Sequence, residues 1–275
     1  MPALLLTPLL VFLLTFFVLP FGVMLVESLY LSPLQSPAGS AMTFANYAKA
    51  FGDAFYLRVL LQTVALGIAV TVLTLVLGYP VAYFLARTRS RRRHVLLFLV
   101  ISPLVVSIVI RSYGWMVLLG RAGTVNTLLV ALGLAERPLP LMYNWFGVIV
   151  ALTHVLLPFM ILTLASVIEG IPESLEDTAA VLGAGWWSRF RHVILPLSME
   201  GVGAGVTLVF MLTIGSFVSI LLLGGSDTLV LPLLIYQQIS LLNNNFAAAL
   251  GMLLLVLSLA LLYAQARVFR VRGAA

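Results

Sequence analysis

The chain has 275 residues, of which 62% are hydrophobic and only 9% are charged, and its formal net charge is +6. A water-soluble protein of this length needs more charged surface. The composition therefore indicates an all-α, polytopic membrane protein with one transmembrane domain over residues 1–275. The absence of cysteine excludes a disulfide framework, a thiolate metal site and a cysteine nucleophile.

Six apolar segments are long enough to cross a membrane as helices, at residues 4–25, 59–85, 95–118, 145–167, 202–223 and 246–263. The first has no basic region before it and no small-residue cleavage site after it. We therefore interpret it as a retained helix rather than a signal peptide. Shorter helices are expected in three of the connecting loops, at residues 44–51, 125–132 and 229–242.

The basic residues favour one orientation of these helices. With the termini inside, the inner segments hold ten arginines, five at positions 87–93, two at 189–191 and three at 267–272. The outer segments hold four basic residues, Lys49, Arg58, Arg121 and Arg137. The positive-inside rule therefore predicts that both termini and the loop at residues 171–198 are cytoplasmic. The rule also explains the net charge without a nucleic-acid partner. It accounts for the arginine-rich turn at 87–93 as well, for which an anionic-lipid or ATPase contact is the alternative.

Two ionisable side chains, Arg111 and His154, fall inside the predicted membrane helices. Burying an arginine at mid-membrane costs about 2.5–3.5 kcal/mol on insertion scales. Arg111 lies roughly 10 Å from the outer end of its helix, at a rise of about 1.5 Å per residue. It can therefore either extend outward to the interface or face a translocation path. A single histidine on an apolar helix is more typical of a hydrogen-bonded core residue than of a proton relay.

The polar stretch at residues 171–198 lies between the fourth and fifth predicted membrane helices and is expected to contain two short helices. Ser174 followed by Asp177 has the spacing of a helix N-terminal capping box. Gly183 and Gly185 are predicted to end the first helix, because glycine tolerates the backbone conformation of a helix C-terminus.

The second short helix is predicted at residues 188–195, and Pro196 then precedes the next membrane helix. Four residues of the first helix recur at intervals of three and four and should share one face: Glu176, Ala179, Ala180 and Gly183. Small side chains on such a face let another protein approach the backbone closely. On spacing alone, a solvated linker helix fits equally well.

This stretch carries a resemblance to a known family. The series Asp177, Thr178, Ala179, Ala180, Gly183 and then Ile194-Leu195-Pro196 resembles the coupling loop of ABC-importer permeases, whose pattern is Glu-Ala-Ala, then Gly, then Ile-x-Leu-Pro. Thr178 is interposed, so the acid before the two alanines is Asp177 or Glu176. We call residues 171–198 the coupling loop. Further segments are similar to spermidine/putrescine-type permeases, at residues 111–120 with Asn126, 217–225 and 247–250.

The resemblance implies the six-helix, type I importer permease fold in a bacterial inner membrane. In that family two permeases pair within the lipid, often as two different chains. Two copies of a cytoplasmic ATPase bind ATP, and an external binding protein delivers the substrate. The residues implied to contact the ATPase are Glu176, Asp177, Thr178, Ala179, Ala180 and Gly183.

A polyamine is the implied substrate, and a polycation calls for carboxylates and aromatic faces. The predicted membrane interior has almost no acid, and polyamine-type permeases often carry an acid where this chain has Ser216. A partner permease or the binding protein can supply the acids. The candidate path residues are Arg111, Tyr113, Trp115, Ser216, Ser219 and Tyr236, for which packing or interfacial roles are the alternative.

Other function classes fit the sequence less well. Without a Walker-type GxxxxGK[ST] loop, the chain is not expected to bind ATP or any other cofactor itself. A secondary transporter needs paired ionisable groups within the membrane, which Arg111 and His154 do not provide. Three scattered histidines, with no HExxH or GxSxG motif, predict neither a catalytic nor a metal site. A permease of the same class for another small organic or inorganic solute remains the alternative.

Overall fold

The computed structural model describes residues 2–31 and 42–273, and over these ranges the chain forms helices and turns but no strand. The all-α prediction is therefore confirmed. The helices pack into two compact units, Met1–Leu61 with Val230–Leu259, and Gln62–Leu229 with Ala260–Ala275. A single domain over the whole chain stays a prediction, and the two units are described separately below.

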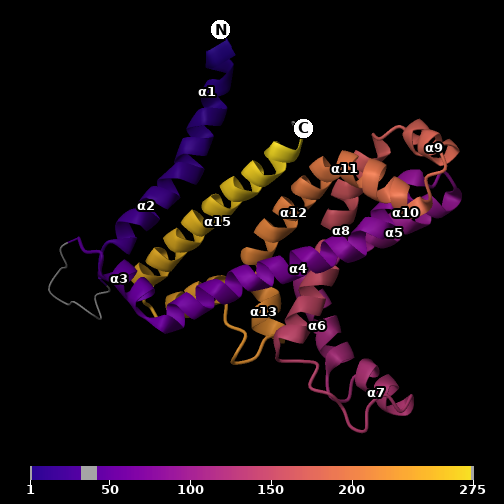
Figure 1. Cartoon of the computed structure of the whole chain (residues 1–275). Helices are drawn as coiled ribbons and strands as arrows, with labels where there is room; N and C mark the ends of the chain where they lie inside the picture. Colours follow the sequence, from indigo (N-terminus) through magenta and orange to yellow (C-terminus); the bar gives the residue numbers. More distant parts are fainter. Residues whose placement is uncertain (1, 32–41, 274–275) are drawn as a thin grey trace. The chain divides into compact units, whose positions relative to one another are not determined.

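The first unit begins with a continuous apolar helix. It consists of α1 (Pro2–Leu13), a π-helical turn η1 (Leu14–Val18) and α2 (Leu19–Ser28) (Figure 1). The unit also contains α3 (Ala45–Gly52), α14 (Leu231–Ser240) and the first parts of α4 (Ala54–Arg87) and α15 (Asn244–Gly273).

Buried polar side chains hold the first unit together. The Asn46 amide donates to the carbonyl oxygens of Ser28 and Tyr30 at 3.0 and 2.8 Å. The Asn245 amide donates to the Glu27 carboxylate at 3.0 Å. The buried amide donors of both asparagines therefore have acceptors, as packing in an apolar environment requires.

The second unit is built around α8 (Trp145–Glu169), whose inward face is buried along its length. The unit also holds the rest of α4 from Gln62 and the end of α15 from Ala260. Its other helices are α5 (Arg91–Val105), α6 (Ile108–Leu119), α7 (Thr124–Ala131), α9 (Glu173–Val181), α10 (Trp186–Arg189), η2 (Phe190–Ile194), α11 (Leu195–Leu197), α12 (Met199–Ile214) and α13 (Val218–Leu223). Two glycines of α12 allow it to approach α8 closely, because a Cβ at Gly205 would lie 2.7 Å from Met160 Sδ, and one at Gly201 would lie 2.9 Å from Val167 Cβ.

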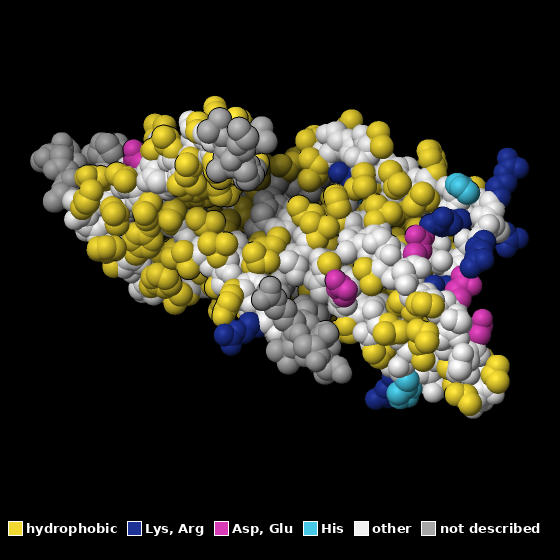
Figure 2. Space-filling view, turned by 90° about the horizontal axis from the view of Figure 1, so that it is seen from above, with side chains coloured by type: hydrophobic (Ala, Val, Ile, Leu, Met, Phe, Trp, Pro, Cys, Tyr) yellow, Lys and Arg dark blue, Asp and Glu magenta, His cyan; other side chains and the backbone are white. Residues whose placement is uncertain are grey.

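Within the described part of the chain, five helical segments are long and apolar enough to cross a membrane: Thr7–Ser28, Ala54–Arg87, Ile108–Ala131, Trp145–Glu169 and Asn244–Gln265. The pair Trp186–Leu197 and Met199–Ile214, bent by 66°, makes a sixth if it counts as one span. In the second unit, charged side chains gather at the end where Figure 1 places α9 and α10 (Figure 2).

Two predicted membrane helices are wrong in detail, because each is broken. The segment at 95–118 divides into α5 and α6 around Val106 and Ser107, where the Val106 N–H bonds to the Pro103 carbonyl instead of continuing an α-helix. The segment at 202–223 divides after Ile214 into α12 and α13. The other four predicted membrane helices are confirmed. Short helices are present where three were expected in loops, as α3, α7 and α14, although α7 lies within the apolar segment Ile108–Ala131.

Candidate functional site

The coupling loop begins with helix α9, which runs from Glu173 to Val181. Two acids in its first turn, Glu173 and Glu176, complement the positive end of the helix dipole. The predicted capping box is wrong. Pro172 occupies the N-cap position and no side chain caps the helix, because Ser174 already lies within the first turn, where its carbonyl accepts the Thr178 hydroxyl at 2.7 Å.

The end of α9 is a Schellman motif built on Gly183, as predicted. Gly183 has φ +85°, its N–H donates to the Ala180 carbonyl at 3.0 Å, and the Ala184 N–H donates to the Ala179 carbonyl at 2.9 Å. Gly185 does not end α9. It is instead the N-cap residue of α10, in extended conformation. The second helix of the loop is present and continues through η2 and α11 to Leu197, beyond its predicted bounds.

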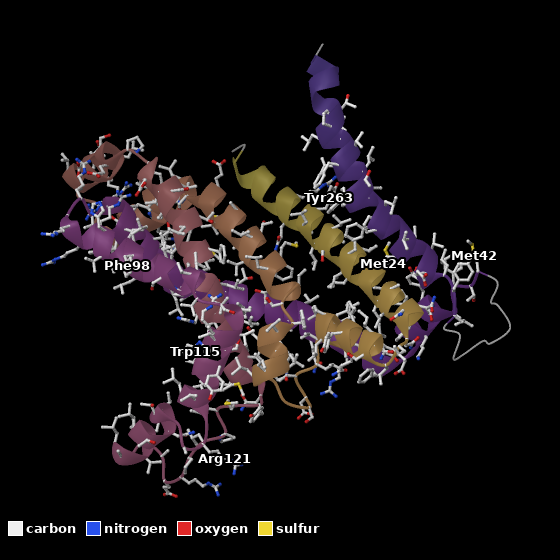
Figure 3. All side chains as sticks on the ribbon, turned by 180° about the vertical axis from the view of Figure 1, so that it is seen from behind. Met24, Met42, Phe98, Trp115, Arg121 and Tyr263 are labelled. Carbon is white, nitrogen blue, oxygen red and sulfur yellow. The ribbon has the colours of Figure 1, made fainter. Side chains whose placement is uncertain are left out.

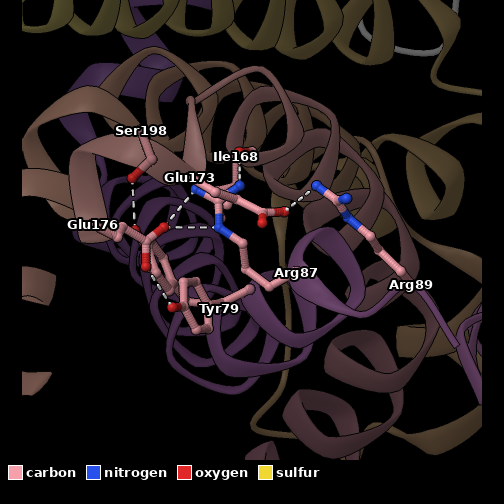
Figure 4. A network of polar contacts seen from close by, with 8 residues as sticks. Tyr79, Arg87, Arg89, Ile168, Glu173, Glu176 and Ser198 are labelled. Carbon is pink, nitrogen blue, oxygen red and sulfur yellow. Dashed lines mark hydrogen bonds and ion pairs between the residues drawn. The ribbon is translucent and has the colours of Figure 1, made fainter. Parts of the chain in front are cut away.

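Glu176 is 7% exposed and points into the protein rather than to its surface. Arg87 Nε donates to one carboxylate oxygen at 2.8 Å, and the Tyr83 hydroxyl donates to the other at 2.8 Å. Arg87 Nη1 also donates to the Ile168 carbonyl at 3.0 Å, in the last turn of α8 (Figure 4). The carboxylate is therefore held at both oxygens by groups from the end of α4.

Two further arginines of the 87–93 turn pair with acids around α9. Arg89 lies 3.0 Å from Glu173, with the two side chains 84% and 45% exposed, and Arg93 pairs with Glu169. Exposed pairs of this kind contribute about 0.2–1 kcal/mol. Removing one partner of a buried pair costs about 3–5 kcal/mol. The Arg87–Glu176 pair, with side chains 14% and 9% exposed, is therefore the strongest attachment of α9.

The predicted ATPase-contacting residues divide between the two sides of α9. Glu176 is buried and Ala179 is half-buried, whereas the outer side exposes Asp177, Thr178, Ala180 and Gly183. This outer side continues into an exposed apolar surface at Val181, Leu182, Trp186 and Trp187. Apolar and aromatic groups that remain uncovered beside small residues are typical of a protein-binding surface.

A ladder of aromatic rings connects this surface to α4. Trp186 and Trp187 both stack on Phe190, with ring centroids 5.8 and 5.4 Å apart. Phe190 in turn meets the edge of Tyr79 at 5.3 Å. The Tyr79 hydroxyl lies 2.6 Å from Ser198 Oγ, at the bend that precedes α12. Both helical parts of the coupling loop therefore contact α4.

The candidate path residues of the second unit differ in burial and in hydrogen bonding. Trp115, labelled in Figure 3, donates from Nε1 to His154 Nδ1 at 3.3 Å. This contact agrees with His154 as a hydrogen-bonded core residue. Ser219 is buried, 3.3 Å from Ser112 Oγ. Arg111 is half-buried, and its Nε and Nη1 have no hydrogen-bond partner among the described residues.

Two further candidates, Tyr113 and Ser216, belong to the same unit, and Tyr236 belongs to the first unit. Tyr113 is 65% exposed on α6, and the Ser216 hydroxyl donates to the Leu212 carbonyl at 2.7 Å. Tyr236 lies on α14. Among residues 2–31 and 42–273, no group of three or more acidic, histidine or cysteine side chains could hold a metal ion.

Comparison with known proteins assigns the chain to a family. Residues 78–270 match the model of the binding-protein-dependent transport system inner membrane component. The chain belongs to this family of permeases. It is similar to the spermidine/putrescine transport system permease protein PotB of Haemophilus influenzae, at 35% identity over 82% of this chain and 79% of that protein. It is also similar to PotB of Escherichia coli, at 37% identity over 71% of each chain.

The fold of the permease agrees with this assignment. A solved bacterial ABC transporter that imports the acidic polysaccharide alginate matches with a TM-score of 0.76 and 21% identity, over 98% of this chain and 94% of that one. The permease is thus the membrane component of an ABC importer in the inner membrane.

Sequence reasoning missed the ionic contacts that position α9 in the permease. Glu169, Glu173 and Glu176 recur at intervals of four and three, opposite the arginine turn at 87–93. That matched charge pattern was a usable signal. We attributed the arginines to membrane topology, with an anionic-lipid or ATPase contact as the alternative, and assigned them no acidic partner within the chain.

Proposed function

We propose that the permease forms one half of a translocation pore and transmits the action of a separate, cytoplasmic ATPase through its coupling loop. The observation that carries this proposal is α9 itself. The helix is anchored inward through Glu176, while Asp177, Ala180 and Gly183 stay exposed on its outer side. An anchored helix with a small-residue, uncovered face is suited to docking on another subunit.

The proposed assembly has four kinds of component besides lipid. The permease pairs with a second permease chain, two ATPase copies bind the two coupling loops, and an external binding protein delivers the solute. Both termini and the coupling loop face the cytoplasm in this arrangement, because the basic residues are concentrated on that side. ATP is bound only by the ATPase copies.

A polyamine is the proposed substrate, because the relatives named above are spermidine/putrescine permeases. The permease itself offers few carboxylates to such a cation. Glu27 lies at the end of α2 and Glu169 at the end of α8. In this proposal the second permease and the binding protein supply the remaining acids. The acid-poor interior also favours one alternative, an importer of the same class for another small solute.

Uptake by a reconstituted complex tests this proposal. Liposomes would hold the permease with its second permease and ATPase, and would receive the cognate binding protein, ATP and labelled spermidine or putrescine. We expect ATP-dependent uptake that unlabelled polyamine abolishes, and none in liposomes without this chain. ATP hydrolysis that the binding protein stimulates without polyamine uptake would show that the substrate is another solute. It would still support an importer of the same class. A complex that binds no ATPase would contradict the coupling role.

Arg111→Gln tests whether Arg111 faces the path. A positive charge about 4 Å from an ammonium group costs about 1 kcal/mol in water. Removing that charge is therefore expected to lower the KM for spermidine about fivefold, since 1.4 kcal/mol corresponds to about tenfold. Arg137→Gln, at an exposed arginine of the loop after α7, serves as the control. An unchanged KM in Arg111→Gln would place Arg111 outside the path.

A further inference from the structure

We propose that Arg87 is a positioning residue that locks the coupling helix α9 to the end of α4, so that α4 is the membrane helix that receives the displacement of α9. This inference rests on the proposed coupling role of the loop. It assigns Glu176, which the family resemblance placed toward the ATPase, to an internal contact instead. It also assigns a specific task to one arginine of the 87–93 turn.

Arg87 joins three helices through a single guanidinium group. Its side chain extends from the last residue of α4, bonds to Glu176 of α9 through Nε, and reaches the Ile168 carbonyl of α8 through Nη1. The Ile168 carbonyl lies in the last turn of α8, where a cation also complements the helix dipole. The planar guanidinium group serves these two acceptors from donors in fixed positions, so a lysine, with its single flexible ammonium, is not equivalent at this position.

Burial makes this contact a rigid connection. The Arg87 and Glu176 side chains are only 14% and 9% exposed, so neither can exchange its partner for water without first being uncovered. Tyr83 holds the second carboxylate oxygen and removes the remaining freedom of the group. By contrast, Arg89 is 84% exposed in its pair with Glu173, and water can replace either partner.

A second contact falls on the same face of α4. Tyr79, Tyr83 and Arg87 are spaced by four residues, which places them along one side of the helix. Tyr83 and Arg87 hold α9, whereas Tyr79 contacts Phe190 and Ser198 in the second half of the coupling loop. Both halves of the loop therefore meet one stripe of α4, and a displacement of the loop must act on that helix.

The test compares Arg87→Gln with Arg89→Gln in the complete reconstituted complex. Both changes remove an arginine from the same turn, but only the first removes a buried ion pair. We expect Arg87→Gln to retain the ATPase subunit within about twofold and to lower the polyamine taken up per ATP hydrolysed by about tenfold or more. Arg89→Gln is expected to leave that ratio within about twofold of the unmodified complex.

Three results would overturn the proposal: an unchanged ratio in Arg87→Gln, an equal fall in Arg89→Gln, or loss of the ATPase subunit from Arg87→Gln. If Arg87→Gln yields no complex, Tyr83→Phe is used to test the proposal instead. This milder change keeps the ion pair and removes only the hydrogen bond to the second oxygen of Glu176. The proposal then requires a lower ratio in Tyr83→Phe, and an unchanged one overturns it. Failure of the unmodified complex to bind ATPase would instead refute the proposed function.

Discussion

Gly183→Arg is expected to abolish co-purification of the ATPase subunit with the permease. Gly183 has φ +85°, a conformation that costs an L-residue about 1–2 kcal/mol, and it closes the Schellman motif that ends α9. No atom lies within 4 Å of a Cβ added there, so the new side chain extends outward from the exposed side of the loop. A bulky cation on a docking surface of small residues should reduce bound ATPase about tenfold or more, as measured by affinity purification of the tagged permease.

The matched control is Gly133→Arg, because Gly133 also has a positive φ of +70° and open space around its Cβ, but follows α7. It introduces the same backbone strain away from the coupling loop. Ala180→Trp should resemble Gly183→Arg without backbone strain, since Ala180 is exposed within α9. Equal ATPase binding in all three variants would show that the outer side of α9 is not the docking surface.

Gly225→Ala is expected to have the largest effect on stability. A Cβ at this position would overlap the carbonyl oxygen of Tyr143 and lie 2.9 Å from its carbonyl carbon, and backbone atoms cannot rotate away as a side chain can. Tyr143 is itself constrained, with φ 59° and its N–H bonded to the Leu223 carbonyl at 3.1 Å. Overpacking of this kind costs about 3 kcal/mol. The midpoint of thermal unfolding in detergent should then fall by roughly 6 °C or more.

Gly215→Ala provides the comparison for that experiment. Gly215 lies at the break between α12 and α13, close to Gly225 in sequence, but its added Cβ would meet nothing nearer than the Met211 carbonyl oxygen at 3.6 Å. We expect its unfolding midpoint to match the unmodified permease within about 2 °C. Similar losses in the two variants would mean that the contact between Gly225 and Tyr143 does not limit stability.

The sequence predicted α9 and its end well, because local chemistry decides both. Gly183 is the residue that a left-handed helix terminus favours, and no distant contact is needed to place it. The breaks within two membrane helices were not predictable in the same way. Val106 and Ser107 lie in an apolar run, where hydrophobicity stays high whether the helix continues or not. Pro103 was the local signal, yet membrane helices tolerate proline.

The contacts of Glu176 could not be derived from periodicity. Its spacing with Ala179, Ala180 and Gly183 predicted one shared face, but Glu176 is buried whereas Ala180 and Gly183 are exposed, so these residues do not share a face. The burial of Glu176 depends on Arg87, which lies 89 residues away in the sequence. The matched charges indicate that the acids around α9 pair with the arginine turn, but which of these pairs is buried is a property of tertiary packing.

The attachment of α9 has a consequence for chimeric importers. Residues 171–198 look like a portable module, because they are contiguous and carry the family pattern. Transplanting this module into another permease would move Glu176 without Arg87 and Tyr83, and would leave a carboxylate enclosed with no cation beside it. The smallest exchangeable unit is therefore discontinuous. It comprises the loop together with the terminal two turns of α4.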